Sequence, residues 1–107
     1  MNTQFKKGIV ELCVLSLIKK KDMYGFEVIE ILSKAIDVNE NTVYPILRRL
    51  TSQNYFETYF QTTNQGAPRK YYRITNQGIS IYADYIDEWY TFLKGVNYIL
   101  GGNQNEK

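Results

Sequence analysis

Histidine is absent from this chain of 107 residues, and cysteine occurs once, as Cys13. His and Cys supply most general bases, activated nucleophiles and zinc ligands in proteins, so their scarcity argues against an enzyme and against a zinc site. The eleven acidic residues are scattered along the chain. We therefore expect no catalytic residue, no metal ligand and no cofactor. A single cysteine also cannot form a disulfide within the chain.

Long apolar runs are missing too. No segment approaches the roughly 20 apolar residues that a membrane-spanning helix needs. The apolar stretch at 9–18 contains Glu11 and has no small-residue cleavage site after it, so it is not typical of a signal peptide. With 44% hydrophobic residues, the chain has the composition of one folded globular domain. We expect a cytoplasmic protein with no membrane partner.

The net charge of +2 is small, but it is unevenly distributed. Residues 38–75 contain five basic and two acidic residues, a net charge of +3, whereas residues 76–107 have a net charge of −2. A basic middle segment beside an acidic end is a modest electrostatic signature of nucleic-acid binding.

Apolar residues at helical spacing predict three helices in the first half of the chain. The first covers residues 5–18. The second has Asp22 as its N-cap and an apolar stripe that runs from Gly25 to Ile36. After a break at 37–38, Asn39 is placed to cap the third helix, whose inner stripe is Val43, Ile46, Leu47 and Leu50. So short a connection between the last two helices indicates a helix-turn-helix.

Pro45 leaves the start of the third helix open. A helix that begins at Asn39 would be kinked by Pro45, whereas regular helix from Thr42 would hold Pro45 in its first turn at little cost. Asn54 follows the last apolar residue and suits the left-handed conformation that ends many helices. Residues 55–62 and 69–74 are rich in aromatic and β-branched residues and flank a turn cluster, which predicts a β-hairpin.

The last segment predicts one helix of about 25 residues, or about 37 Å, that Thr75 caps and that Gly101 and Gly102 end. Its apolar residues recur in an unbroken heptad seam. One small domain cannot cover so long a stripe, so we expect a symmetric homodimer with this seam at its interface. The seam residues are Ile79, Tyr82, Ile86, Trp89, Leu93, Val96 and Leu100.

This order predicts a mainly α fold with a small β-hairpin: a winged helix-turn-helix domain at 1–75, a dimerisation helix at 76–101 and a flexible tail at 102–107. The blocks YGFEVIEIL (24–32), NTVYPILRRL (41–50) and GAPRKYYRIT (66–75), with Gly78, resemble the PadR family of bacterial transcriptional regulators. The single C-terminal helix resembles the short-tailed branch of that family. Asn41 and Asn54 stand where the family often has Gly, a mild change because Asn is the next most permissive residue.

The resemblance implies a sequence-specific DNA-binding regulator, a repressor that binds a pseudo-palindromic operator as a homodimer. The exposed face of the third helix would enter the major groove, and the wing would lay basic residues on phosphates. The candidate DNA-binding residues are Tyr24, Asn41, Thr42, Tyr44, Arg48, Arg49, Arg69 and Lys70, with Arg49 assigned to phosphate. A merely solvated helix face is the alternative interpretation. The alternative function is a winged-helix dimer that docks on protein and does not bind DNA.

Trp89 also has two interpretations. As a seam residue it would be a packed anchor of the dimer. Some PadR relatives, however, resemble drug sensors that hold flat aromatic ligands between the two Trp residues of a dimer. Trp89, with Asp84 one turn earlier, looks like that arrangement, and a small flat aromatic effector could stack there.

Overall fold

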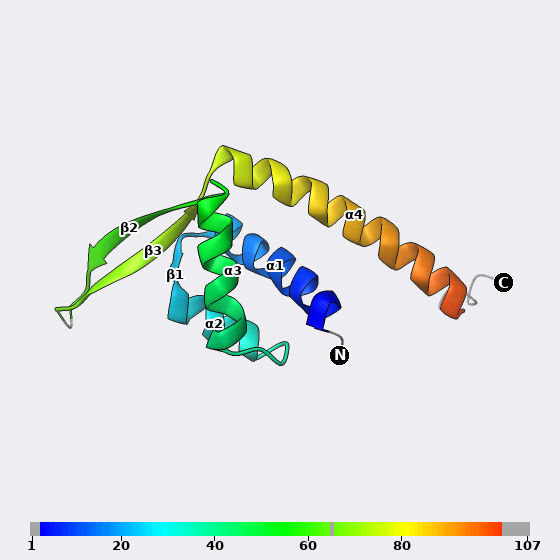
Figure 1. Ribbon diagram of the computed structural model, residues 1–107, viewed down its shortest axis with the longest axis horizontal. Coiled ribbons are helices and arrows are strands. Elements are labelled where there is room, and N and C mark those ends of the chain that lie inside the picture. The colour runs from blue at the N-terminus through cyan, green and yellow to red at the C-terminus, as the bar shows by residue number, and fades with distance from the viewer. Residues whose placement is uncertain (1–2, 65, 102–107) are drawn as a thin grey trace.

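The computed structural model describes residues 3–64 and 66–101 (Figure 1). The predicted order of three helices, a hairpin and a long last helix is confirmed, and so is the winged helix-turn-helix fold. The tail expected at 102–107 lies outside the described residues. In chain order the elements are α1 (Thr3–Lys20), β1 (Met23–Tyr24), α2 (Gly25–Ser33), α3 (Glu40–Ser52), β2 (Phe56–Thr62), β3 (Pro68–Ile74) and α4 (Asn76–Leu100).

The core lies where α1, α2 and α3 pack on the base of the hairpin. The predicted inner stripe of α3 is fully buried, and the polar residues of α3 therefore face away from the core. Burying one Leu or Ile side chain stabilises the fold by about 1.5–3 kcal/mol, so this stripe fixes which face of α3 is free. The buried apolar residues are Val10, Val14, Leu15, Ile18, Met23, Val28, Ile29, Leu32, Val38, Val43, Ile46, Leu47, Leu50, Phe56 and Tyr72.

The sheet has three strands, one more than the predicted hairpin. The strand order is β1-β3-β2, and β1 pairs antiparallel with β3 so that Met23 lies opposite Tyr72 and Tyr24 opposite Tyr71. β1 is only two residues long, too short to give a periodic signal in the sequence.

The predicted limits of the second helix were wrong at both ends. Tyr24, not Asp22, holds the N-cap position of α2, and no side chain caps that end. The Asp22 carboxylate instead accepts a hydrogen bond of 2.6 Å from the Tyr59 hydroxyl, a partner 37 residues away. α2 ends at Ser33 rather than near Ile36, and it is Val38, beyond the helix, that is buried.

The alternatives for α3 are decided by its cap. The Asn39 side chain accepts a hydrogen bond from the Asn41 amide at 2.9 Å, and the helix runs from Glu40. Pro45 therefore lies inside the helix, beyond its first turn, on the exposed side. At the other end Asn54 has φ 68°, the left-handed conformation that its sequence position predicts.

α4 begins as predicted, with the Thr75 hydroxyl accepting a hydrogen bond from the Gly78 amide at 2.9 Å, and ends at Gly101 with φ 84°. Its first half contacts α1 and packs on the core through Ile81, Tyr82 and Tyr85. Its second half continues away from the other helices, on the side opposite the hairpin (Figure 1). The molecule is accordingly elongated, 59 × 27 × 23 Å. Within the described ranges, no helix is long and apolar enough to cross a membrane.

Candidate nucleic-acid interface

The outward face of α3 is polar and accessible. Asn41, Tyr44, Pro45 and Arg48 are exposed, and Thr42 is half-buried. Asn41, Thr42, Tyr44 and Arg48, four of the predicted DNA-binding residues, thus lie on the outward face of α3, from its first turn to its last third. Such a face can meet base edges, because Arg and Asn side chains pair bidentately with guanine and adenine in the major groove.

The hairpin brings basic residues from β3 beside this helix. A groove of about 420 Å³ separates α3 from the hairpin, and both Arg48 and Lys70 line it. A second groove, of about 630 Å³, continues toward the start of α2 and is lined by Tyr24, Arg69 and again Lys70. Tyr44 lines both grooves. Five of the eight predicted residues therefore surround one connected surface: Tyr24, Tyr44, Arg48, Arg69 and Lys70.

Several residues of these grooves were missed by sequence reasoning. They are Gly25, Phe26, Glu30 and Thr51. For Gly25 the structure shows a clear physical reason for the absence of a side chain. A Cβ added there would lie 2.6 Å from the Tyr44 ring, so the absent side chain lets Tyr44 lie against the start of α2. No local pattern could indicate this contact, because it joins residues from two helices.

Arg49 lies apart from these grooves. Its guanidinium makes two hydrogen bonds to the Glu11 carboxylate of α1, at 2.8 and 3.3 Å, and a longer one of 3.4 Å to Gln53. The hydrogen bond to Glu11 raises the pKa of Arg49 above its usual value. The structure thus directs Arg49 toward α1, where it fixes α3 to the body of the domain, and not toward the face that carries Arg48.

The outer face of the sheet carries stacked aromatic and basic side chains. Tyr59 stacks on Tyr71 with ring centroids 5.6 Å apart, and Tyr71 meets Tyr24 edge-to-face at 5.5 Å. The Arg69 guanidinium lies 4.4 Å over the Tyr24 ring, and that of Arg73 lies 4.8 Å over Tyr59. The hydrogen bond to Asp22 raises the pKa of the Tyr59 hydroxyl.

The predicted seam of α4 is only partly covered within one chain. Tyr82, Ile86, Trp89, Leu93 and Val96 are half-buried, whereas Ile79 and Leu100 are exposed. Beside the seam, large apolar side chains of the second half are open to solvent, including Phe92, Tyr98 and Ile99.

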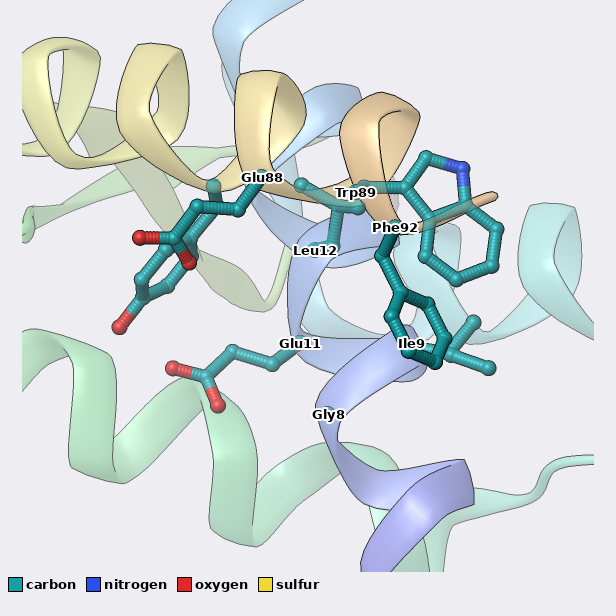
Figure 2. A pocket seen from close by; sticks show the side chains of 8 residues that line it. Gly8, Ile9, Glu11, Leu12, Glu88, Trp89 and Phe92 are labelled. Atoms are coloured by element: carbon teal, nitrogen blue, oxygen red, sulfur yellow. The ribbon is translucent and has the colours of Figure 1, made fainter. Parts of the chain in front are cut away.

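Trp89 lines a cavity of about 480 Å³ between α1 and α4. Figure 2 shows the Phe92 ring near Ile9 with the Trp89 ring beside it, and the Glu11 and Glu88 side chains on the other side of the cavity. Asp84, which the sequence suggested as a partner of Trp89, is exposed and does not line this cavity. The acidic groups beside the aromatic wall are therefore Glu11 and Glu88. Among the described residues no cluster of His, Cys, Asp or Glu could hold a metal ion.

A winged helix-turn-helix with an exposed α3 face and basic wing residues on one surface defines a DNA-binding class of fold. Residues 14–84 match the family model described as the transcriptional regulator PadR-like family. The chain belongs to this family of DNA-binding transcriptional regulators.

Solved structures agree with this assignment. A PadR-like transcriptional regulator from Bacillus cereus is 31% identical, with 92% of this chain and 97% of that chain covered and a TM-score of 0.83. A PadR family transcription regulator from Clostridium difficile is 30% identical, with coverage of 86% and 98% and a TM-score of 0.79. A PadR-like transcription factor from Bacteroides fragilis is 34% identical, with coverage of 91% and 95% and a TM-score of 0.77.

Proposed function

We propose that the protein is a homodimeric repressor that binds a pseudo-palindromic operator, with α3 in the major groove and the hairpin as a wing on the backbone. The observation that carries this proposal is the single surface on which Arg48 of α3 and Lys70 of β3 line the same groove. Two such surfaces in a dimer would need to lie about one DNA turn apart, roughly 34–36 Å, to meet successive major grooves.

The proposed contacts divide by role. Arg48, Asn41, Thr42 and Tyr44 would read bases, since all four lie on α3 away from its buried stripe. Arg69 and Lys70 on the wing, and Tyr24 at the start of α2, would contact the backbone. Arg49 is left out of these contacts because its guanidinium is engaged by Glu11.

Two substitutions test the proposed roles by different signatures. Arg48→Ala should weaken operator binding by about 1–3 kcal/mol and relax preference at one base position, because a bidentate Arg–guanine contact is lost. Lys70→Ala should weaken binding to all duplexes alike and flatten the salt dependence, because one phosphate contact is lost. The measurement is a gel-shift titration on a duplex selected by the wild-type protein from a genomic pool. Lys94→Ala, an exposed residue of α4, serves as the control and should bind normally.

The same titration separates DNA binding from the alternative, a module that docks on protein. Neutralising phosphates releases counterions, so the logarithm of DNA affinity falls steeply with the logarithm of salt concentration, whereas an apolar protein interface responds far less. If no duplex is selected, the protein does not bind DNA sequence-specifically and the proposed function fails. If a duplex is selected but neither substitution changes its binding, the DNA-binding face is wrongly assigned.

We further propose that the cavity beside Trp89 accepts a flat, cationic aromatic effector. The supporting observation is its lining, with the aromatic rings of Tyr85, Trp89 and Phe92 together with the Glu88 carboxylate, whereas the Glu11 carboxylate of the same lining is already paired with Arg49. Aromatic faces and carboxylates both attract a delocalised cation. An effector that binds better to a dimer with differently spaced α3 helices would lower operator affinity by no more than its differential affinity for the two forms.

Fluorescence provides the measurement, because Trp89 is the single Trp of the chain. A planar cationic dye should quench Trp89 emission, and the same dye should weaken operator binding in the gel-shift titration. Quenching with unchanged DNA affinity would indicate a pocket without regulation. No quenching across a panel of such dyes would leave Trp89 as a packed anchor.

A further inference from the structure

A row of contacts crosses the outer face of the sheet and ends at a wing arginine. The register explains it. Tyr24 of β1 lies opposite Tyr71 of β3, and Tyr71 lies opposite Tyr59 of β2, so the three rings stand in line across all three strands. Directly opposed side chains on one face are the pairs that stabilise a sheet, and aromatic pairs are among the strongest. This tyrosine row (Tyr24, Tyr71 and Tyr59) is therefore a built feature of the sheet.

Both ends of the tyrosine row are tied. At one end the Tyr59 hydroxyl donates a hydrogen bond of 2.6 Å to Asp22, which lies between α1 and β1. The hairpin is thereby attached to the body of the domain beyond its strand pairing. At the other end the ring of Tyr24 supports the Arg69 guanidinium, 4.4 Å from the ring centroid.

Arg69 is exposed. An exposed arginine that is not held by a neighbour loses side-chain conformational entropy when binding fixes its rotamer. The guanidinium lies over the Tyr24 ring, and Arg69 lines the groove at the start of α2 together with Tyr44 and Lys70. A side chain already held in its bound position costs less to order on binding. The contact with Tyr24 thus restricts the Arg69 side chain before DNA binds, as packing restricts side chains inside the domain.

We propose that Tyr24 is a positioning residue for DNA binding, whose ring, held by the tyrosine row, presents Arg69 to the DNA backbone. This proposal rests on the proposed function, and it replaces the direct backbone contact proposed above for Tyr24 with an indirect role through Arg69. The ring matters and the hydroxyl does not.

Four variants test the proposal by gel-shift titration on the selected duplex: Tyr24→Phe, Tyr24→Leu, Arg69→Ala and the double variant Tyr24→Leu/Arg69→Ala. Tyr24→Phe keeps the ring and should bind like the wild type. Tyr24→Leu should weaken binding about two- to fivefold, the size of an exposed cation–π contact. In the double variant the Leu substitution should add nothing to the effect of Arg69→Ala, because the only route by which Tyr24 acts has been removed.

Two results would overturn the proposal. Equal weakening by Tyr24→Phe and Tyr24→Leu would assign the effect to the hydroxyl, and an unchanged effect of Tyr24→Leu without Arg69 would show that Tyr24 acts through something else. Failure of the proposed function gives a different result: the wild-type protein itself then selects no duplex. Failure of the positioning role alone leaves wild-type binding intact.

A measurement on the free protein keeps the proposal testable if Tyr24→Leu folds poorly. The side-chain protons of Arg69 lie over an aromatic ring, so their NMR resonances should be shifted upfield in the wild type and in Tyr24→Phe. Arg69 resonances at the positions of an unstructured arginine would overturn the proposal without any DNA present.

Discussion

Two glutamate–arginine pairs of equal length differ in their surroundings, and the surroundings decide what each contributes. The Glu11–Arg49 and Glu57–Arg73 pairs both have an N···O distance of 2.8 Å. The Glu11 side chain is 14% exposed, whereas the Glu57 side chain is 55% exposed. Solvent and salt screen an exposed pair, but an isolated charge in a half-buried setting is costly.

We therefore expect Glu11→Gln to lower the free energy of unfolding by about 1–3 kcal/mol, because the Arg49 guanidinium loses its charged partner. Glu57→Gln is the matched control and should change it by less than about 1 kcal/mol. Urea denaturation of both variants measures the difference. Equal effects would mean that burial does not distinguish the two pairs.

At the scale of elements, the junction of the hairpin with α4 depends on one missing side chain. Gly78 is buried in the first turn of α4, and a Cβ added there would collide with the Tyr55 carbonyl oxygen and lie 2.6 Å from an Ile74 side-chain carbon. Thr75 holds the same junction from its other side, with a hydroxyl 2.6 Å from the Asn54 carbonyl oxygen. The backbone after α3 and the start of α4 thus touch directly.

Gly78→Ala should destabilise the protein by about 1–3 kcal/mol, because a backbone carbonyl cannot move aside as a side chain can. Gly8→Ala is the control, since Gly8 lies in α1 with open space around it and Ala favours helix by about 0.5–1 kcal/mol. Thermal unfolding by circular dichroism should show opposite shifts in melting temperature. A Gly78→Ala protein as stable as the wild type would contradict the close approach.

Elements with a local cause could be predicted from the sequence. The caps by Asn39 and Thr75 and the left-handed Asn54 each depend on residues within a few positions, and all three are confirmed. β1 could not be predicted, because two residues become a strand only through pairing with β3. The role of Asp22 was missed for the same reason, since its partner Tyr59 is distant in the sequence.

In the candidate site, too, locally determined features could be predicted from the sequence and long-range contacts could not. Sequence spacing placed Asn41, Tyr44 and Arg48 together, because a helical face is a local property and the structure leaves that face exposed. Spacing also put Arg49 next to Arg48, but could not show that Glu11, 38 residues earlier, holds its guanidinium. The partner that a long side chain contacts depends on the tertiary fold, and residue spacing in the sequence does not predict it.

At the scale of the whole molecule, the second half of α4 leaves large apolar side chains in water. Ile99 and Leu100 are 78% and 75% exposed, and an exposed apolar surface of this kind marks an interaction site. We expect Leu93→Asp to give monomers or insoluble chain, because it puts a charge in the seam of the proposed dimer. Light scattering after size-exclusion chromatography at micromolar concentration measures this.

Lys94→Asp is the matched control for that experiment. It places the same acid one residue further along α4, on an exposed side away from the seam, and should leave the dimer intact. A wild-type protein that runs as a monomer under these conditions would refute the dimer.

The extension of α4 beyond the domain has a consequence for the cell. A helix with no core of its own is marginal in water, so the order of its last turns depends on what covers them. If a second copy covers them, folding of this half and association become one equilibrium, and the free energy that holds it grows with the logarithm of the protein's concentration. The amount of protein that the cell synthesises then sets the fraction that is dimeric, in addition to any effect of an effector.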